Sequence, residues 1–190
     1  MNITDAITQR RTIRKYKQHS IPKDILKNLV NAARLAPSAM NKQPLEYVII
    51  DDKPLVESLF EQVKWAGYIA PRGTPKEGEK PTAFLLILIK KELKTAYTNH
   101  DIGAAAQNIM LQAEEYDIGC CWIGSLNRDR VSDILNVPQV YELDTIIALG
   151  YKDEKSEYYD SDETVSYDKI DGKYKVPKRR LETITHFNAF

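Results

Sequence analysis

Three arginines and a threonine close to the N-terminus could bind a phosphate group. They lie in the segment Arg10-Arg11-Thr12-Ile13-Arg14. Guanidinium groups bind phosphate through paired charge-assisted hydrogen bonds, and a hydroxyl adds a further donor. A charge run is also commonly a solvated face, so this segment has two interpretations. A second basic cluster, Lys178-Arg179-Arg180, lies near the C-terminus.

A second group of polar side chains lies in residues 37–44, between two prolines. Ser38, Asn41 and Gln43 place hydroxyl and amide groups within six residues of one another. These residue types also form ordinary turns. Because the prolines stiffen the segment, it could instead present these groups to the polar edge of a ligand. We name residues 37–44 the proline loop.

The stretch from Thr98 to Ser125 contains the segments against which most of the remaining chain is expected to pack. Apolar side chains recur every three or four residues from Ile102 to Ala113, which predicts a buried helix. Thr98 and Asp101 resemble a capping box at the start of this helix, and Gly119 is a residue at which the helix could end. Residues 119–125 are apolar and short, which predicts a buried strand that ends at Gly124-Ser125. Packing alone could also explain this pattern.

The other regular segments surround this helix and strand. Strands are expected at residues 45–50, 83–89 and 145–150, and helices at 2–9, 22–36, 54–65 and 128–135. Residues 66–82 contain three glycines and three prolines, and so long an irregular loop suggests a lid. From Tyr151 onward the chain is polar and poorly periodic, which predicts a tail that is loose or wrapped over another surface.

Composition limits the class of protein. A length of 190 residues predicts one domain, and equal totals of 27 basic and 27 acidic residues provide no global field for nucleic acid or an anionic membrane. The longest apolar run, residues 83–89, is too short to span a bilayer, and the N-terminus lacks an apolar signal segment. We therefore expect a cytoplasmic protein. Cys120 and Cys121 are adjacent in the expected strand and are interpreted as small buried residues.

Side-chain catalysis has little support in the sequence. No histidine or cysteine spacing suggests a metal site, and no GxSxG or GxGxxG motif occurs. If the chain is an enzyme, we expect a bound cofactor to carry the chemistry. No catalytic residue and no metal ligand is therefore assigned.

Five segments in order along nearly the whole chain resemble the nitroreductase family of FMN-dependent oxidoreductases. They are RRTIR at 10–14, APSAMNKQP at 36–44, DIGAAAQNIMLQA at 101–113, GCCWIGS at 119–125 and PKRRL at 177–181. The resemblance implies an α+β fold with a central mixed β-sheet flanked by helices. It also implies a homodimer with FMN at the interface, in which residues 1–190 form one domain. Residues 151–190 would be a domain-swapped C-terminal arm that reaches the partner.

The resemblance also implies which residues contact the flavin. Arg10, Thr12, Lys178 and Arg180 match phosphate-binding positions, and Arg14 matches a basic position near the ribityl chain or the pyrimidine edge. The proline loop would contact the flavin of the neighbouring protomer, and the segment around Gly124 would lie beside the reactive N5 atom. The implied cofactor-binding set is Arg10, Arg11, Thr12, Arg14, Ser38, Ala39, Asn41, Gln43, Ile123, Gly124, Ser125, Lys178 and Arg180.

Three features depart from the family pattern. Leu45 stands where many relatives have an aromatic residue after Gln43-Pro44, and Gly124 stands where some have an acidic residue. Residues 66–82 replace a longer helical excursion. These departures bear on substrate preference, whereas the flavin-contacting motifs are retained.

The expected activity is electron transfer from NADH or NADPH through FMN to a small acceptor such as a nitroaromatic compound or a quinone, by a ping-pong mechanism. One alternative is a flavoprotein of the same fold with another reaction, such as reductive dehalogenation or flavin-ring breakdown. Another alternative is a non-enzymatic flavin, anion or nucleic-acid binder that uses the two basic clusters.

Overall fold

The computed structural model describes residues 1–190, which form two compact units, Met1–Asp153 and Glu154–Phe190. The first unit contains five helices: α1 (Ile3–Gln9), α2 (Lys23–Arg34), α3 (Lys53–Phe60), α4 (Thr98–Glu115) and α5 (Arg128–Ile134). Its five strands are β1 (Tyr16–Lys17), β2 (Leu45–Ile50), β3 (Ala83–Lys90), β4 (Ile118–Ile123) and β5 (Tyr141–Lys152). Short 3-10 turns occur at Ala39–Asn41, Gly67–Ile69 and Lys91–Leu93.

Strand β5 organises the sheet of the first unit. Along one edge it pairs with β3 and, at its C-terminal end, with β1. Along its other edge it pairs with β4. Strand β2 pairs with β3 and extends the sheet on that side. These strand pairs are antiparallel, and a parallel bridge between Thr12 and Cys120 adds a contact on the outer edge of β4. The α+β class and the central sheet flanked by helices are therefore confirmed, but the strands of this sheet pair in antiparallel instead of mixed fashion.

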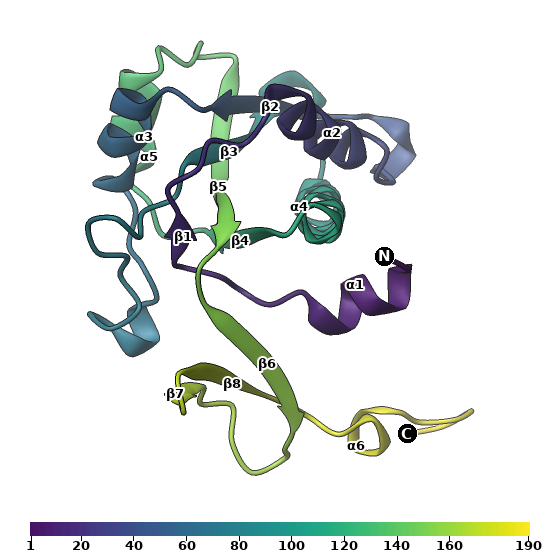
Figure 1. Ribbon diagram of the computed structural model, residues 1–190. Helices are drawn as coiled ribbons and strands as arrows, with labels where there is room; N and C mark the ends of the chain where they lie inside the picture. Colours follow the sequence, from purple (N-terminus) through teal and green to yellow (C-terminus); the bar gives the residue numbers. More distant parts are fainter. The chain divides into compact units, whose positions relative to one another are not determined.

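Alternating side chains of the sheet supply two cores. Leu85 and Ile87 face a cluster that includes α2 and α4, whereas Phe84 and Leu86 face a cluster that includes α3 and α5. The sheet thus lies between two helical layers, as Figure 1 shows. Every residue of β3 except its last is buried, as expected for an apolar strand covered on both faces.

The N-terminal segment runs tightly along the sheet because two glycines make room for it. A Cβ atom at Gly119 would lie 2.6 Å from Cγ2 of Ile13, and one at Gly150 would lie 2.7 Å from Cβ of Tyr16. The side chains of Ile13 and Tyr16 are buried in these places. Residues 10–16 are therefore held against β4 and β5 by packing that only glycine permits.

Both ends predicted for the long helix are wrong in their detail. The N-cap of α4 is Tyr97 without a side-chain cap, because the Asp101 carboxylate accepts hydrogen bonds from the proline loop. The helix ends at Glu115, and Asp117 makes the turn with φ of 55°. Gly119 lies within β4, where it accommodates Ile13.

Several other boundaries differ from the prediction: β4 ends at Ile123 instead of Ser125, and α2 ends at Arg34 instead of Ala36. Two further differences have a clear cause. Helix α3 ends at Phe60 instead of Trp65, because Val63 forms an antiparallel bridge with Leu126. Strand β5 begins at Tyr141 instead of Thr145, since it continues along the full length of β3. In both places backbone pairing between distant segments overrides the local pattern.

The loop 66–82 is fastened at both ends to segments distant in sequence. Before it, the Lys64 amide donates to the Ser125 carbonyl over 2.9 Å. At its end, the Tyr16 amide donates to the Glu79 carbonyl over 3.0 Å, and the Glu79 carboxylate pairs with Lys15. The role of this loop as a lid stays a prediction.

The second unit has regular structure that the sequence analysis does not predict. It contains β6 (Lys155–Asp160), β7 (Asp168–Ile170), β8 (Lys173–Lys178) and α6 (Leu181–Ile184). Strand β8 pairs in parallel with β6 and in antiparallel with β7. Asp171 and Gly172 join β7 to β8 with positive φ angles of 49° and 78°, as a two-residue hairpin requires. The unit begins at Glu154, close to the expected start of the arm.

No helix combines the length and apolar character needed to cross a membrane.

Candidate functional site

The arginine segment, residues 10–14, lies along the outer edge of β4. Thr12 forms a parallel bridge with Cys120, and the Ile13 amide donates to the Cys120 carbonyl over 3.0 Å. Burial raises the pKa of the Cys120 thiol to about 12, and Glu114 adds to the rise, whereas the positive charge of Arg10 opposes it. The Arg10 cation therefore contributes to the electrostatic environment of Cys120 on β4.

Arg11 is directed back to the helix that precedes it. Its Nη2 atom donates to the Thr8 carbonyl over 2.7 Å, near the C-terminal end of α1. A cation at this end of a helix interacts favourably with the helix dipole. Arg10 also closes the helix, since its amide donates to the Ala6 carbonyl.

The backbone from Ile123 to Ser125 is fixed by hydrogen bonds to three successive carbonyl groups. Thr145 Oγ1 donates to the Ile123 carbonyl over 2.8 Å and itself accepts from Trp122 Nε1 over 2.7 Å. Arg128 Nη2 donates to the carbonyls of Gly124 and Asp144 over 3.0 and 2.7 Å. The third carbonyl, on Ser125, accepts the hydrogen bond from the Lys64 backbone amide.

These bonds determine where the neighbouring amide hydrogens point. Carbonyl and N–H of one trans peptide point in opposite directions. Because the Ile123 carbonyl is directed to Thr145 on β5, the Gly124 N–H points to the outer edge of β4. The Thr12 bridge lies on this same edge. The outward Gly124 N–H and the backbone of the arginine segment therefore share one edge of β4.

Gly124 leaves space beside this backbone. A Cβ atom placed there would have no other atom within 4 Å. The indole of Trp122 is partly exposed next to it, although its ring nitrogen is bonded to Thr145. The side of the backbone to which a Gly124 side chain would point is thus open, so a planar ligand could approach this backbone closely.

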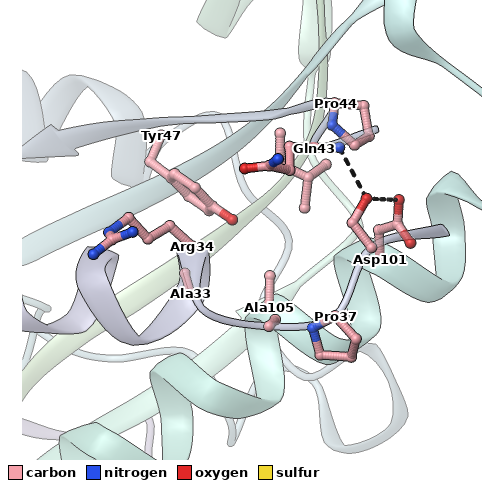
Figure 2. A pocket seen from close by; sticks show the side chains of 11 residues that line it. Ala33, Arg34, Pro37, Gln43, Pro44, Tyr47, Asp101 and Ala105 are labelled. Atoms are coloured by element: carbon pink, nitrogen blue, oxygen red, sulfur yellow. Dashed lines mark hydrogen bonds between the residues drawn. The ribbon is translucent and has the colours of Figure 1, made fainter. Parts of the chain in front are cut away.

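The proline loop is held from beneath by Asp101 of α4. Ser38 Oγ donates to Asp101 Oδ2 over 3.0 Å, and the Ala39 amide donates to Oδ1 over 2.9 Å. The Gln43 amide donates to Ser38 Oγ over 3.0 Å, and Gln43 Nε2 reaches the Asn41 carbonyl over 3.3 Å. Figure 2 shows the two bonds that end on Ser38 Oγ. The loop therefore presents the exposed residues Met40 and Asn41 outward.

A cavity of about 160 Å³ lies behind the proline loop. Pro37, Gln43 and Pro44 line it on the loop side, and Ala33 and Tyr47 line it from α2 and β2 (Figure 2). Burial raises the pKa of Tyr47 to about 12, with further contributions from the charges of Asp101 and Glu46. The Tyr47 phenol therefore stays protonated at neutral pH.

Lys178 and Arg180 belong to the second unit. Lys178 is exposed at the end of β8. Arg180 is the N-cap residue of α6, where its amide donates to Asp162 Oδ1 over 3.1 Å and its side chain stays largely exposed. A hydrogen bond from Thr183 is the main cause that lowers the pKa of Asp162, so this carboxylate stays charged beside Arg180.

Two of the predicted groups are brought together in the first unit. The arginine segment and residues 123–125 lie on one edge of β4, whereas Ser38, Ala39, Asn41 and Gln43 form a separate group over the start of α4. The supporting residue Thr145 carries no local signal, because it bonds a strand distant in sequence. Arg128 bonds the carbonyl of Gly124, four residues before it, as well as that of Asp144. Asp101 is part of a predicted motif, but its partner is the proline loop instead of its own helix.

Comparisons with known proteins agree with this architecture. The model of the nitroreductase family matches residues 7–151. A protein of Archaeoglobus fulgidus, provisionally named NADH dehydrogenase/NAD(P)H nitroreductase, is 27% identical over 170 residues, which cover 86% of this chain and 93% of the relative. An iodotyrosine deiodinase of Thermotoga neapolitana is 26% identical over 175 residues, covering 85% and 94%.

A solved structure is similar over almost the full length. The FMN-dependent nitroreductase of Clostridium difficile has a TM-score of 0.74 and 27% sequence identity, over 98% of this chain and 99% of that chain. Fold, motif order and family match thus define an α+β protein with the nitroreductase architecture. The chain belongs to the nitroreductase family.

Proposed function

We propose that this chain is an FMN-dependent oxidoreductase that uses NADH or NADPH as electron donor. The observation that carries the proposal is the shared edge of β4, along which the arginine segment and the fixed backbone of residues 123–125 lie. A flavin mononucleotide needs both features, because its phosphate requires cations and its ring requires a close, ordered backbone. The family match and the named relatives support the same cofactor.

The residues present fit this cofactor. Gly124 leaves room for a ring against the backbone, and its outward N–H can donate to a ring nitrogen or oxygen. Arg10 and Thr12 would hold the phosphate, with Lys178 and Arg180 completing the site from the second unit. Arg11 and Arg14 would add positive charge, with Arg14 towards the ribityl chain or the pyrimidine edge.

Bound FMN would supply the two-electron chemistry, accepting a hydride from the nicotinamide and passing electrons to a nitroaromatic compound, a quinone or a similar acceptor in a ping-pong sequence. The protein would position both substrates on one face of the ring and exclude one while the other is bound. No side chain is needed as general acid or base, because solvent can supply protons. The guanidinium groups stabilise negative charge nearby.

A homodimer would complete the site. Ser38, Ala39, Asn41 and Gln43 would approach the flavin from the partner protomer, because they form a group separate from the edge of β4. Residues 151–190 would act as an arm that reaches the partner, so that residues 1–190 work as one FMN-binding domain. Exposed apolar side chains at Leu181, Ile184, Phe187 and Phe190 support an arm that is covered in the assembly.

The visible absorption spectrum of the purified protein tests the proposal. Flavin bands that bleach under anaerobic NADH or NADPH are expected, and the more effective donor identifies the physiological class of reductant. Addition of a nitroaromatic compound or a quinone should then restore the oxidised bands. A colourless protein that takes up no added FMN would refute the assignment.

The relative named iodotyrosine deiodinase supports a second candidate, reductive dehalogenation on the same cofactor. In that case neither nicotinamide would bleach the flavin at a useful rate. A flavin reduced with dithionite should instead be reoxidised by a halogenated phenol with release of halide. Flavin-ring breakdown and non-enzymatic ligand binding would give neither response.

A further inference from the structure

Asp101 is a buried carboxylate whose partners lie outside its own helix. It lies in the first turn of α4 and is 5% exposed. Its two oxygens accept from Ser38 Oγ and the Ala39 amide over 3.0 and 2.9 Å. Hydrogen bonds to a charged acceptor contribute more than those between neutral groups. Asp101 therefore fixes the first residues of the proline loop to the helical layer.

The same carboxylate also closes the far side of the loop. Ser38 Oγ accepts from the Gln43 amide while it donates to Asp101, so a continuous chain of hydrogen bonds runs from Gln43 through Ser38 to Asp101. The hydroxyl hydrogen of Ser38 is used in this chain. Ser38 thus acts on the conformation of the loop instead of donating this hydrogen to a ligand.

The backbone between these bonds adopts a conformation that requires support. Met40, Asn41 and Gln43 have positive φ angles of 53°, 52° and 48°. Residues other than glycine rarely adopt positive φ angles, and the surrounding structure must offset the conformational free energy that these angles cost. Three such residues within four positions indicate that local preference alone does not determine the loop.

Hydrogen bonds supply that support. Within the loop, the Asn41 and Lys42 amides donate to the carbonyls of Ser38 and Ala39 over 2.9 and 3.1 Å. A cavity of about 160 Å³ lies between the loop and the side chains of Ala33 and Tyr47 (Figure 2). The hydrogen bonds to Asp101 therefore link the first residues of the loop to α4.

We propose that Asp101 is the positioning residue of the proline loop and sets the geometry in which Asn41 and Gln43 meet the flavin. The inference rests on the proposed function for its ligand, whereas the constraint on the loop holds for the protein alone. Asp101 does not touch the cofactor; it acts through Ser38 and Ala39. Loss of the carboxylate should release the loop and weaken FMN binding while α4 stays folded.

The test uses the full-length apoprotein and the variants Asp101→Asn, Ser38→Ala and their combination. FMN affinity is measured by quenching of FMN fluorescence, and mobility of the loop by amide hydrogen exchange resolved for single residues across 37–44. Asp101→Asn should weaken FMN binding about tenfold or more and accelerate exchange at residues 39 and 43. The combined variant should be hardly weaker than Asp101→Asn alone, because both remove the same chain of bonds.

Glu114 provides a matched control on the same helix. It is also 5% exposed, and it pairs with Lys152 instead of the proline loop. Glu114→Gln should lower the thermal midpoint, yet leave FMN affinity within about twofold and exchange at residues 37–44 unchanged. This comparison separates positioning from general stability.

Two results would overturn the inference. One is an amide exchange rate at residues 39 and 43 that is the same in Asp101→Asn as in the wild type, with or without a change in FMN affinity. The other is an equal loss of FMN affinity in Asp101→Asn and Glu114→Gln, which would indicate a stability effect only. If the wild-type protein binds no FMN, the proposed function fails, and the exchange measurement still decides whether Asp101 constrains the loop.

Discussion

Neighbouring residues of β4 serve different parts of the molecule. Cys120 belongs to the core that includes α2 and α4, whereas Cys121 belongs to the core that includes α3 and α5. Neither forms a disulfide, and both are buried on opposite faces, as the alternation of side chains along a strand predicts. The interpretation of the pair as small buried residues is confirmed.

This burial predicts slow thiol chemistry. Because burial raises the pKa of Cys120 to about 12, very little thiolate exists at pH 8. Iodoacetamide at that pH should leave both cysteines unmodified in the native protein and label both in urea. Rapid labelling of the native protein, read by intact mass, would contradict the burial of this strand.

The candidate site could be predicted from residue types only in part. The arginines, the proline loop and Gly124-Ser125 stand out because their types and order along the chain are informative. Thr145 does not stand out, and the role of Asp101 is not evident from its motif, because each is defined by a partner brought near through strand pairing or helix packing. A threonine in a strand and an aspartate in the first turn of a helix look ordinary in sequence.

Among the elements, β4 and the arginine segment depend on one another through glycine. Gly119→Ala would place a methyl group 2.6 Å from Ile13, and the backbone of one segment would have to move. We expect a loss of about 1–3 kcal/mol in unfolding free energy by urea denaturation and a parallel loss of FMN affinity.

Gly67→Ala is the control for this prediction. No atom lies within 4 Å of the added methyl group, so stability should change by less than about 0.5 kcal/mol. Equal stability of the two alanine variants would show that Ile13 does not depend on Gly119 for its place.

The ion pair between Glu79 and Lys15 anchors the end of the loop 66–82, and the stability that it provides should depend on pH. The hydrogen bond from Lys15 is the main cause that lowers the pKa of Glu79 below its usual range. A carboxyl group whose pKa is lowered in the folded state stabilises the folded protein at pH values above the ordinary glutamate pKa. This stabilisation is lost as the pH falls through the lowered pKa.

Glu79→Gln tests this dependence. At pH 7 the variant should be less stable than the wild type by at most about 1 kcal/mol, because the pair is partly exposed. The difference in urea midpoint should shrink as the pH falls below 4. A difference that stays constant down to pH 2.5 would exclude the ion pair as its origin.

At the element scale the strongly periodic segments were predictable, and the boundaries set by distant pairing were not. Strand β2 has the predicted bounds, and all but the last residue of the buried strand β3 was predicted. The end of α3 and the start of β5 follow from Val63 with Leu126 and from the length of β3. In the second unit the hairpin depends on Asp171-Gly172, a turn signal that the surrounding polar, poorly periodic sequence obscures.

For the whole molecule, the family resemblance implies that arginines from both ends of the sequence contact one phosphate. Arg10→Ala and Arg180→Ala should each weaken FMN binding by about tenfold or more, as loss of a charge-assisted bond implies. If both contact one phosphate, their effects should couple in a double-mutant cycle. Fluorescence titration of the four proteins measures the coupling, and small additive effects would refute a shared site.

The place of β5 in the sheet has a consequence for synthesis. It is the last strand of the first unit, yet β1, β3 and β4 all pair with it. At about 5–20 residues per second, a ribosome takes roughly 3 to 12 s to pass from the end of β3 to the end of β5. During that delay the apolar strand β3 lacks one neighbour, so the nascent chain should need protection from aggregation. Ribosome-bound chains stopped before Tyr141 should stay sensitive to protease, whereas early resistance would contradict this order of assembly.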